Sequence, residues 1–421
     1  MPFPDHRDSW LTARRLRAHG TILAFCLWSM YIWNVATPGL RDRNGNLKGT
    51  DFLHLYTLGS LAIAHRGTDL YDMNAQAALA AKLVPEAAGI RYLPLYPPHV
   101  SVFFASLAHL PYIWALALWW GCSAVIYAIC WYSVWRSCPN LHQHGATIAI
   151  LAAAFPAFFN LIAWGQTSAA ALACFTMMYF LLRDRQAFLA GLVLGCLIFK
   201  PQLGVAAAFV FIAIGAWKTV AGAVLAASAQ LFVGVLYYGI EPFRQWFRVL
   251  RNVQGVLPLL EPRLYQTHSL RTFWTMLLPQ AAGPILPFVL YLVSAGGVLA
   301  MTIACWKRRD VPLPLRYSAL LLSSVLVAPH LTVYDLVILA PAFLLLADWV
   351  TGHALTASTR HLGTLLYLIY MLPLLGPFTR WTHVQLSVIA MVLAVYVIWS
   401  ISGVIDSSAA TGRSKGIATA W

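Results

Sequence analysis

The sequence predicts an all-α polytopic membrane protein, and its composition and charge distribution carry that prediction. Of the 421 residues, 60% are apolar and only 10% are charged, and the mean hydropathy is +0.70. A soluble domain is about 45–50% apolar and about 25% charged. The formal net charge of +14 does not indicate nucleic-acid binding, because the basic residues stand between long apolar runs. We therefore expect a chain that crosses a bilayer several times and has no nucleic-acid partner.

Twelve apolar runs approach the roughly 20 residues that cross a hydrocarbon core as a helix. The first follows a basic N-terminus and lacks a small-residue cleavage site, so we expect an uncleaved span rather than a signal peptide. We treat residues 1–421 as a single domain with about 12 transmembrane helices. The runs cover 21–37, 111–135, 145–163, 166–182, 187–199, 202–217, 219–239, 283–306, 316–330, 334–350, 361–376 and 384–404.

Residues 97–110 form a shorter apolar segment that opens on two prolines. If this segment does not span, nine basic residues of short loops share the side of the basic N-terminus, and only Lys200 and Arg380 lie opposite. Cytoplasmic loops carry the excess of Lys and Arg, so we expect a re-entrant or interfacial segment and cytoplasmic termini. The nine residues are Arg136, Arg183, Arg185, Lys218, Lys307, Arg308, Arg309, Arg316 and Arg360.

Two long segments remain on the outer side under this topology. The first outer loop, 39–96, contains runs at 51–64 and 74–83 that read as amphipathic helices along the membrane surface. The second outer loop, 241–281, alternates arginine with tryptophan, phenylalanine and leucine, which is also an interfacial pattern. Long ordered loops usually carry function.

Polar residues from six separate segments fall on this same non-cytoplasmic side. Charged and polar groups at membrane depth are costly, and they mark functional sites by default. Their convergence predicts a polar cavity that opens outward under the two outer loops. The candidate substrate-binding and catalytic residues are Asp51, His54, Tyr96, His99, Gln166, Lys200, Gln202, His268, Arg271, His330 and Asp335.

Asp51 is the candidate general base. It follows Gly49-Thr50 and precedes a helical run, so the alternative is a helix N-cap, where aspartate is among the preferred residues. A partly exposed carboxylate can take a proton from an acceptor hydroxyl. His54 follows one helical turn later on the same face, where it could orient Asp51 or bind substrate.

Lys200 stands between two short apolar runs and is followed by Pro201 and Gln202. It is either a lysine that snorkels to the interface or a cation for a phosphate at a broken helix end. Arg271, with His268, could clamp a phosphate or a sugar. The alternative for Arg271 is a headgroup-binding loop shared with Arg244, Arg248, Arg251 and Arg263. For Gln166 and Asp335 the alternative is helix capping.

Several chemistries lack their usual signatures. No phosphate-binding loop, dinucleotide fingerprint, zinc-protease motif or serine-hydrolase elbow is present. The seven cysteines form no metal spacing and imply no disulfide framework. Asp69 and Asp72 are close together, but a solvated loop turn is the favoured explanation. We therefore expect no metal site and no cofactor.

These residues carry a resemblance to glycosyltransferase family 87, which belongs to the C-type (GT-C) membrane glycosyltransferases. The similar pieces occur in order across much of the chain, although each is short. The later motif reads Ala-Pro-His and lacks the longer Ser-Pro-x-x-Trp-x-His-His form. The pieces are Asp51-Phe52 with Tyr56, residues 67–71, Tyr96-Pro97-Pro98, Gly165-Gln166, Lys200-Pro201-Gln202, Pro329-His330 and Tyr334-Asp335.

The resemblance implies a GT-C helical bundle that uses a polyprenyl-phosphate sugar, with mannose as the expected sugar. Within this family, the chain resembles the mycobacterial phosphatidylinositol-mannoside mannosyltransferase, although no close match to that enzyme is evident. The acceptor would be a glycolipid or exported glycan, and membrane lipids would surround the protein. Asp51 would be the base of an inverting displacement, and His330 would lie near the donor phosphate or the acceptor.

This function would place the protein in a bacterial inner membrane, with its site on the periplasmic or extracellular side. Transfer is expected to be metal-independent, because a monophosphate leaving group can be stabilised by cationic side chains. Three other functions remain open. They are a transporter or flippase of a lipid-linked sugar, an arabinofuranosyltransferase of the same family, and a ligase that moves a whole oligosaccharide.

Overall fold

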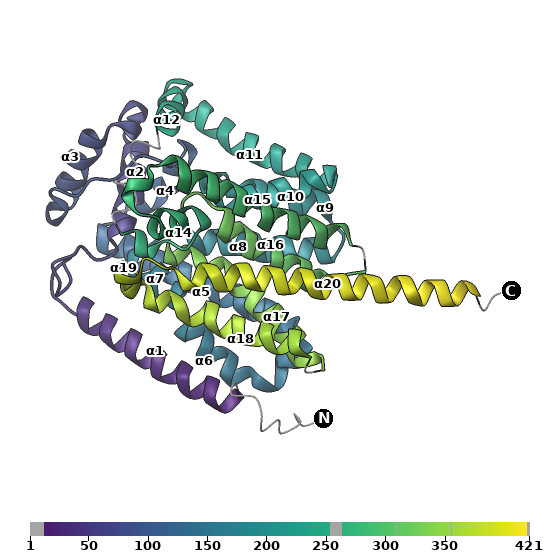
Figure 1. The fold of residues 1–421 in the computed structure, drawn as a ribbon. Coiled ribbons are helices and arrows are strands. Elements are labelled where there is room, and N and C mark those ends of the chain that lie inside the picture. The colour runs from purple at the N-terminus through teal and green to yellow at the C-terminus, as the bar shows by residue number, and fades with distance from the viewer. Residues whose placement is uncertain (1–11, 253–262, 309, 355, 419–421) are drawn as a thin grey trace.

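The computed structural model is built from helices, and it describes residues 12–252, 263–308, 310–354 and 356–418. No β-strand occurs in these ranges. Two isolated bridges pair Arg41 with Leu47 and Thr267 with Thr332. Figure 1 shows the helices gathered in one bundle, with the end of the last helix running past the others. The prediction of an all-α fold is confirmed.

The first half of the chain begins with α1 (Ala13–Val35), followed by the helices of the first outer loop, α2 (Thr50–Ile63), η1 (Gly67–Tyr71) and α3 (Met73–Leu83). Apolar helices then succeed one another with short connections. They are α4 (His99–Ala108), α5 (Tyr112–Arg136), α6 (Gly145–Ala154), α7 (Pro156–Trp164), α8 (Ser168–Arg183), α9 (Ala187–Gly195), η4 (Cys196–Phe199), α10 (Pro201–Ala213) and α11 (Trp217–Tyr238).

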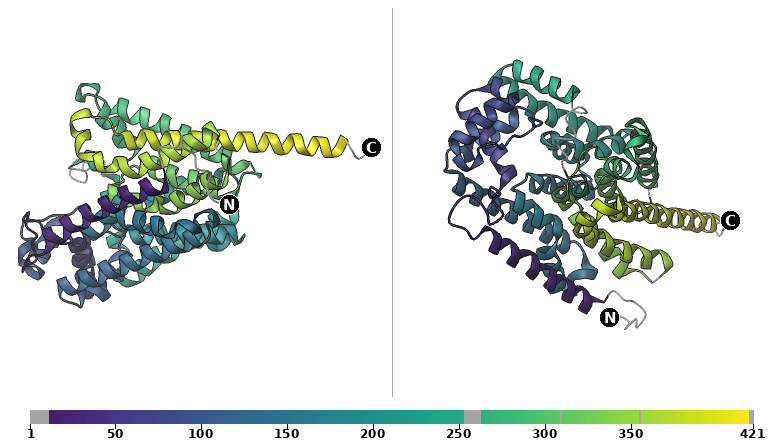
Figure 2. Two further views of the ribbon diagram at one scale, coloured as in Figure 1. Left: turned by 90° about the horizontal axis from the view of Figure 1, so that it is seen from below. Right: turned by 60° about the vertical axis from the view of Figure 1, so that its left-hand side comes forward.

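The second half begins with two helices of the second outer loop, α12 (Glu241–Arg251) and α14 (Leu270–Leu277). The remaining helices complete the bundle, and α20 is the one that extends beyond it in Figures 1 and 2. They are α15 (Ile285–Lys307), α16 (Leu313–Val327), η7 (Val333–Leu339), α17 (Ala340–Gly352), α18 (Ala357–Met371), α19 (Gly376–Thr382) and α20 (Leu386–Ala418).

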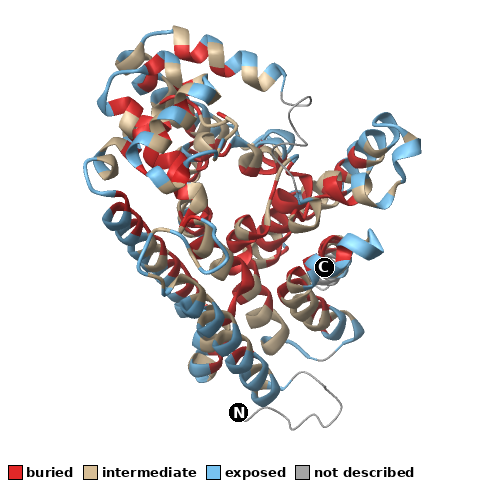
Figure 3. Ribbon diagram, turned by 90° about the vertical axis from the view of Figure 1, so that its left-hand side faces the viewer, coloured by how far each residue is buried: buried red, intermediate tan, exposed pale blue. Residues whose placement is uncertain are grey.

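The centre of the bundle is formed around α16, which is buried from Tyr317 to Val327 without a break. A helix that is apolar on all sides belongs inside a bundle, and Figure 3 shows buried residues concentrated there. A second apolar cluster lies where α2 meets α4 and α5, and it includes Phe52, Leu116 and Trp119. The candidate residues described below come from elements of both packed regions, such as Asp51 on α2 and Asp335 on η7.

The number of membrane spans differs from the prediction of twelve. Within the residues that the structure describes, six helices are long and apolar enough to cross a membrane, or seven if one bent pair counts as a single span. Five others, including α4 and α8, are apolar but have only 10–17 residues. The longest of them, α8, has 16 residues and reaches about 24 Å at about 1.5 Å per residue, less than the roughly 30 Å hydrocarbon core. The bent pair is 139–164, where the chain turns by 42° just before Pro156.

The first outer loop forms the two predicted helices, but α2 is not amphipathic. Residues Phe52–Gly59 are all buried, as are Leu61 and Ala62. Gly59 permits this burial, because a Cβ there would lie 2.3 Å from the carbonyl oxygen of Phe104. The expectation of an α2 with one exposed polar face is therefore wrong. Its partner α4, about 15 Å long, is too short to span, as expected for 97–110.

Candidate functional site

The site begins at the turn between α7 and α8, which brings Gln166 beside Asp51. Gly165 ends α7 with φ +72°, and a Cβ at this position would lie 2.8 Å from the Cβ of Phe52. Trp119 fixes the turn by donating its Nε1–H to the Gly165 carbonyl at 3.0 Å. Only glycine combines this backbone conformation with such a close approach. The turn therefore sets Gln166 against the first turn of α2.

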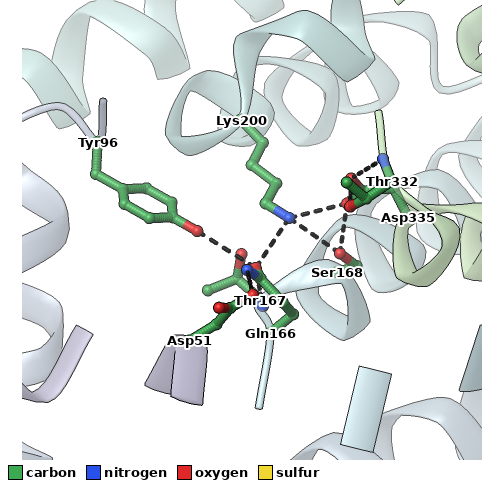
Figure 4. A network of polar contacts seen from close by, with 8 residues as sticks. All are labelled: Asp51, Tyr96, Gln166, Thr167, Ser168, Lys200, Thr332 and Asp335. Carbon is green, nitrogen blue, oxygen red and sulfur yellow. Dashed lines mark hydrogen bonds and ion pairs between the residues drawn. The ribbon is translucent and has the colours of Figure 1, made fainter. Parts of the chain in front are cut away.

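Gln166 connects the residues drawn in Figure 4. Its Oε1 accepts hydrogen bonds from Lys200 Nζ at 3.3 Å, from the Thr167 backbone N–H at 3.3 Å and from the Tyr96 hydroxyl at 3.4 Å. These three donors fix the orientation of the amide, because an NH₂ group cannot accept them. The Nε2 must then face Asp51, and it donates to Oδ2 at 2.6 Å.

Lys200 forms a buried ion pair with Asp335. The distance from Nζ to Oδ1 is 2.8 Å, and the two residues are 5% and 1% exposed. Lys200 also donates to the Ser168 hydroxyl at 3.0 Å, and Ser168 donates to Asp335 Oδ1 at 2.5 Å. The Tyr334 ring lies 5.0 Å from Nζ. Lys200 therefore does not snorkel to an interface.

Asp51 does not cap its helix. The N-cap of α2 is Gly49, and Asp51 lies in the first turn with its side chain turned to Gln166. The N-cap alternative is therefore wrong. Burial raises the pKa of Asp51 to about 6, while the hydrogen bond from Gln166 and the charge of Lys200 act in the opposite direction. A carboxyl group with this pKa exchanges a proton near neutral pH.

Asp335 takes part both in helix capping and in the ion pair with Lys200. Its Oδ2 accepts from the Thr332 backbone N–H at 3.3 Å and closes a capping box at the start of η7. The N-cap is Thr332, so Asp335 takes part in capping as the third residue of the helix and not as the N-cap itself. Its other oxygen carries the ion pair with Lys200. His330, half-buried just upstream, interacts electrostatically with the Asp335 carboxylate.

The second outer loop clamps the 329–335 connector. Thr267 and Thr332 form an antiparallel bridge, and the His268 backbone N–H donates to the Leu331 carbonyl at 3.3 Å. Arg271 Nε donates to the carbonyl of Pro329. The His268 ring is buried, with Nδ1 2.8 Å from the Ser387 hydroxyl, and burial lowers its pKa to about 4. His268 and Arg271 thus hold the segment that carries His330.

The remaining predicted residues lie outside this network. His54 is buried and stacks on Tyr92 with ring centroids 4.9 Å apart, and burial lowers its pKa to about 4. Its ring also lies 5.7 Å from that of Tyr96. His99 is half-buried at the start of α4, and Gln202 is half-buried at the start of α10. Among the described residues, neither of them forms a hydrogen bond or ion pair with Asp51, Gln166 or Lys200.

Sequence reasoning missed Thr167, Ser168 and Thr332. Gln166-Thr167-Ser168 is a polar run at the start of an apolar helix, and that pattern is typical of helix capping. The pattern therefore gave no sign that Ser168 bonds to both Lys200 and Asp335. Within the part of the chain that the structure describes, no group of three or more His, Cys, Asp or Glu side chains could hold a metal ion.

Comparison with known proteins gives one match. The model of glycosyltransferase family 87 matches residues 95–329, which is more than half of the chain. The matched range includes Tyr96, Gln166 and Lys200, whereas Asp51 and Asp335 lie outside it. No curated protein and no solved structure matches the chain.

Proposed function

The chain belongs to glycosyltransferase family 87, and from this premise we propose that it is an inverting glycosyltransferase that uses a polyprenyl-phosphate sugar. The acceptor is a lipid-linked or exported glycan, and transfer takes place on the non-cytoplasmic side of a bacterial inner membrane. The proposed sugar is mannose, and the proposed architecture is the GT-C bundle. The observation that carries the proposal is the Asp51 carboxylate, held at a single oxygen by Gln166.

The proposed chemistry is a single displacement. Asp51 takes the proton of an acceptor hydroxyl, and the hydroxyl oxygen forms a bond to the anomeric carbon of the sugar. The bond from that carbon to the phosphate oxygen breaks, and polyprenyl phosphate leaves with the electron pair. A base must lie within hydrogen-bond reach of the proton it removes, so the carboxylate needs an uncommitted oxygen.

The half-buried Asp51 and the buried Asp335 differ in the hydrogen bonds that their carboxylate oxygens accept. Within the described residues Asp51 Oδ1 accepts no hydrogen bond, whereas Oδ2 accepts one from Gln166. Asp335 accepts from Lys200 and Ser168 at Oδ1 and from Thr332 at Oδ2. We therefore assign the base to Asp51 and a structural role to Asp335.

Lys200 donates to three oxygens, from Gln166, Ser168 and Asp335, and three is the full donor capacity of an ammonium group. A direct hydrogen bond to a donor phosphate would require it to release one of them. We propose that Lys200 acts on the phosphate through its charge. Direct contact would then fall to Arg271 and His330, which meet at the 329–335 connector.

The other proposed assignments follow from position. Tyr96 borders the base through Gln166, so we propose that its ring packs on the sugar. His54, His99, Gln202 and His268 stay predictions as substrate-binding residues. Stabilisation of the leaving phosphate is assigned to cationic side chains, so we propose metal-independent transfer.

The decisive experiment measures sugar transfer by the purified protein in detergent. Synthetic polyprenyl-phosphate mannose is the donor, polyprenyl-phosphate arabinofuranose is the alternative donor, and a bacterial lipid extract supplies acceptors. Asp51→Asn should abolish transfer. Asp69→Asn is the matched control, because Asp69 lies in the same loop and pairs with the exposed Arg66 at 2.5 Å.

Full transfer by Asp51→Asn would remove the base assignment. No transfer by the wild-type protein with either donor would contradict the proposed function itself. Translocation of the sugar lipid in vesicles that survives Asp51→Asn, without any transfer by the wild type, would instead indicate a flippase.

A further inference from the structure

Helix α12 presents a cationic face outside the bundle. Arg244, Arg248 and Arg251 recur at spacings of four and three, so they share one side of the helix, and all three are exposed. Phe247 lies on the same face and is 55% exposed. The buried side of the helix carries Pro242, Phe243 and Trp246, which pack against the rest of the protein.

The charge of this face is not cancelled by its acidic neighbour. Glu241 pairs with Arg244 at 3.5 Å and with Arg248 at 3.4 Å, and the arginine side chains are 65% and 66% exposed. Pairs this exposed contribute little. Three arginines against one glutamate leave α12 with a net charge of +2. The complementary partner of this face is an anionic surface.

The position of α12 identifies that surface as lipid. Only Gly239 and Ile240 separate α12 from α11, which is one of the six helices long and apolar enough to span the membrane. Figure 1 shows α12 at the end of α11, on the side of the molecule where α2 and α3 lie. A helix that follows a span so closely must begin at the membrane surface. An arginine-rich helix with an exposed aromatic residue is typical of interfacial binding.

The buried face of α12 connects to the candidate site. Trp246 donates its Nε1–H to the Leu95 carbonyl at 3.0 Å. The next residue is Tyr96, whose hydroxyl donates to Gln166, the partner of Asp51. η1 closes the corner between α11 and α12, because a Cβ at Gly67 would lie 2.6 Å from the Tyr238 ring. Movement of α12 would therefore displace Leu95 and Tyr96.

We propose that the exposed face of α12 binds anionic phospholipid headgroups at the membrane surface and thereby holds Tyr96 against Gln166. The binding part is independent of the reaction, whereas the consequence for catalysis rests on the proposed function. Anionic lipid should therefore both associate with this helix and raise the rate of sugar transfer.

The first experiment measures binding of pyrene-labelled phosphatidylglycerol to the detergent-solubilised full-length protein. Unlabelled phosphatidylglycerol, phosphatidylcholine and inorganic phosphate serve as competitors. One arginine near an anionic lipid surface contributes about 1 kcal/mol, or about fivefold in affinity. The triple variant Arg244→Gln, Arg248→Gln, Arg251→Gln should thus bind about 100-fold more weakly. The control is Arg91→Gln with Arg380→Gln, which are exposed arginines outside α12.

The second experiment compares transfer in nanodiscs of phosphatidylcholine alone and with added phosphatidylglycerol. Wild type and the control should gain activity with phosphatidylglycerol, and the triple variant should not. Unchanged phosphatidylglycerol binding by a folded triple variant overturns the proposal, as does equal competition by phosphatidylcholine. Equal competition by inorganic phosphate would mean a small-anion site rather than a lipid surface. If binding behaves as expected but wild type transfers no sugar, the proposed function fails and the lipid site stands.

Discussion

Gln166→Leu tests whether the Gln166 amide sets the pKa of the candidate base, Asp51. Leucine has nearly the volume of glutamine but has no N–H for Asp51 Oδ2, which Gln166 reaches at 2.6 Å. The substitution also removes the acceptor for Lys200, Tyr96 and the Thr167 backbone N–H. Gly165 and its hydrogen bond from Trp119, which set the turn, are not changed by the substitution. The change therefore acts on the hydrogen bonds of the base rather than on the fold.

The expected size of the effect follows from the hydrogen bond that leucine cannot donate to Asp51. A hydrogen bond to a charged group is worth about 1.5–3 kcal/mol, and one pKa unit corresponds to about 1.36 kcal/mol. The hydrogen bond from Gln166 lowers the pKa of Asp51, which burial has raised to about 6. Removing this hydrogen bond should raise that pKa further, by about 1–2 units. The ionised fraction at pH 7 then falls by a factor of roughly two to ten.

The assay is the pH dependence of kcat/KM for sugar transfer between pH 5 and pH 9. The acid limb reports the base of the free enzyme. It should lie near pH 6 in wild type, as the pKa of Asp51 indicates, and at roughly pH 7–8 in Gln166→Leu. Activity of the variant should approach that of wild type at pH 9. Gln230→Leu is the matched control, because Gln230 bonds to the backbone carbonyls of Gly195 and Ala226 on α9 and α11.

An acid limb that stays near pH 6 in Gln166→Leu while kcat falls at every pH would refute the reasoning. The amide would then position substrate or support packing without setting the protonation of Asp51. Gln166→Asn separates these possibilities. It keeps the amide but draws it back by one methylene, so a partial shift of the acid limb is expected.

Four further outcomes are expected. Lys200→Met should lower the free energy of unfolding by about 3–5 kcal/mol, because it leaves the Asp335 carboxylate buried without its partner; adding Asp335→Asn should recover part of this loss in denaturant titrations. Burial raises the pKa of Asp51 above its ordinary value, so the stability that it contributes is present below about pH 4 and lost as pH rises through about 6. The apparent Tm of Asp51→Asn should therefore exceed that of wild type at pH 8 and match it near pH 4. Gly39→Cys, at an exposed position with open space around the Cβ, should react with a membrane-impermeant maleimide from outside intact cells, whereas Asp184→Cys should react only after permeabilisation. Prolonged dialysis against EDTA should leave transfer unchanged, and a loss that Mg²⁺ restores would contradict metal-independent chemistry.

The membrane class and most helices could be predicted from the sequence, because apolar runs report helices directly. The number of spans could not. Counting runs treats 187–199 and 202–217 as two crossings, but neither helix, α9 with η4 nor α10, reaches the length of a span. The burial of α2 was also out of reach, because it depends on the approach of α4 at Gly59. The only sign of this close backbone contact in the sequence of α2 is a single glycine, Gly59.

The candidate site was partly predictable for a physical reason. Charges are costly at membrane depth, so the few that remain tend to meet, and topology alone places Lys200 and Asp335 on one side. Their pairing joins residues 135 positions apart, and no local pattern encodes a contact of that range. Local sequence also does not distinguish Asp51 from Asp335 as a base, since both are acids at the start of helical segments.

Hydrogen-bond geometry distinguishes Asp51 from Asp335 as the candidate base. Asp335 is held at both oxygens, by Lys200 and Ser168 on one side and Thr332 on the other. A carboxylate so engaged is stabilised in its ionised form and has little capacity left to take a proton. Asp51 has one partner, a neutral amide, and a pKa of about 6. Acid–base sites commonly contain two acids whose surroundings give them different proton affinities. Here the difference comes from Lys200, which pairs directly with Asp335 and is connected to Asp51 only through Gln166.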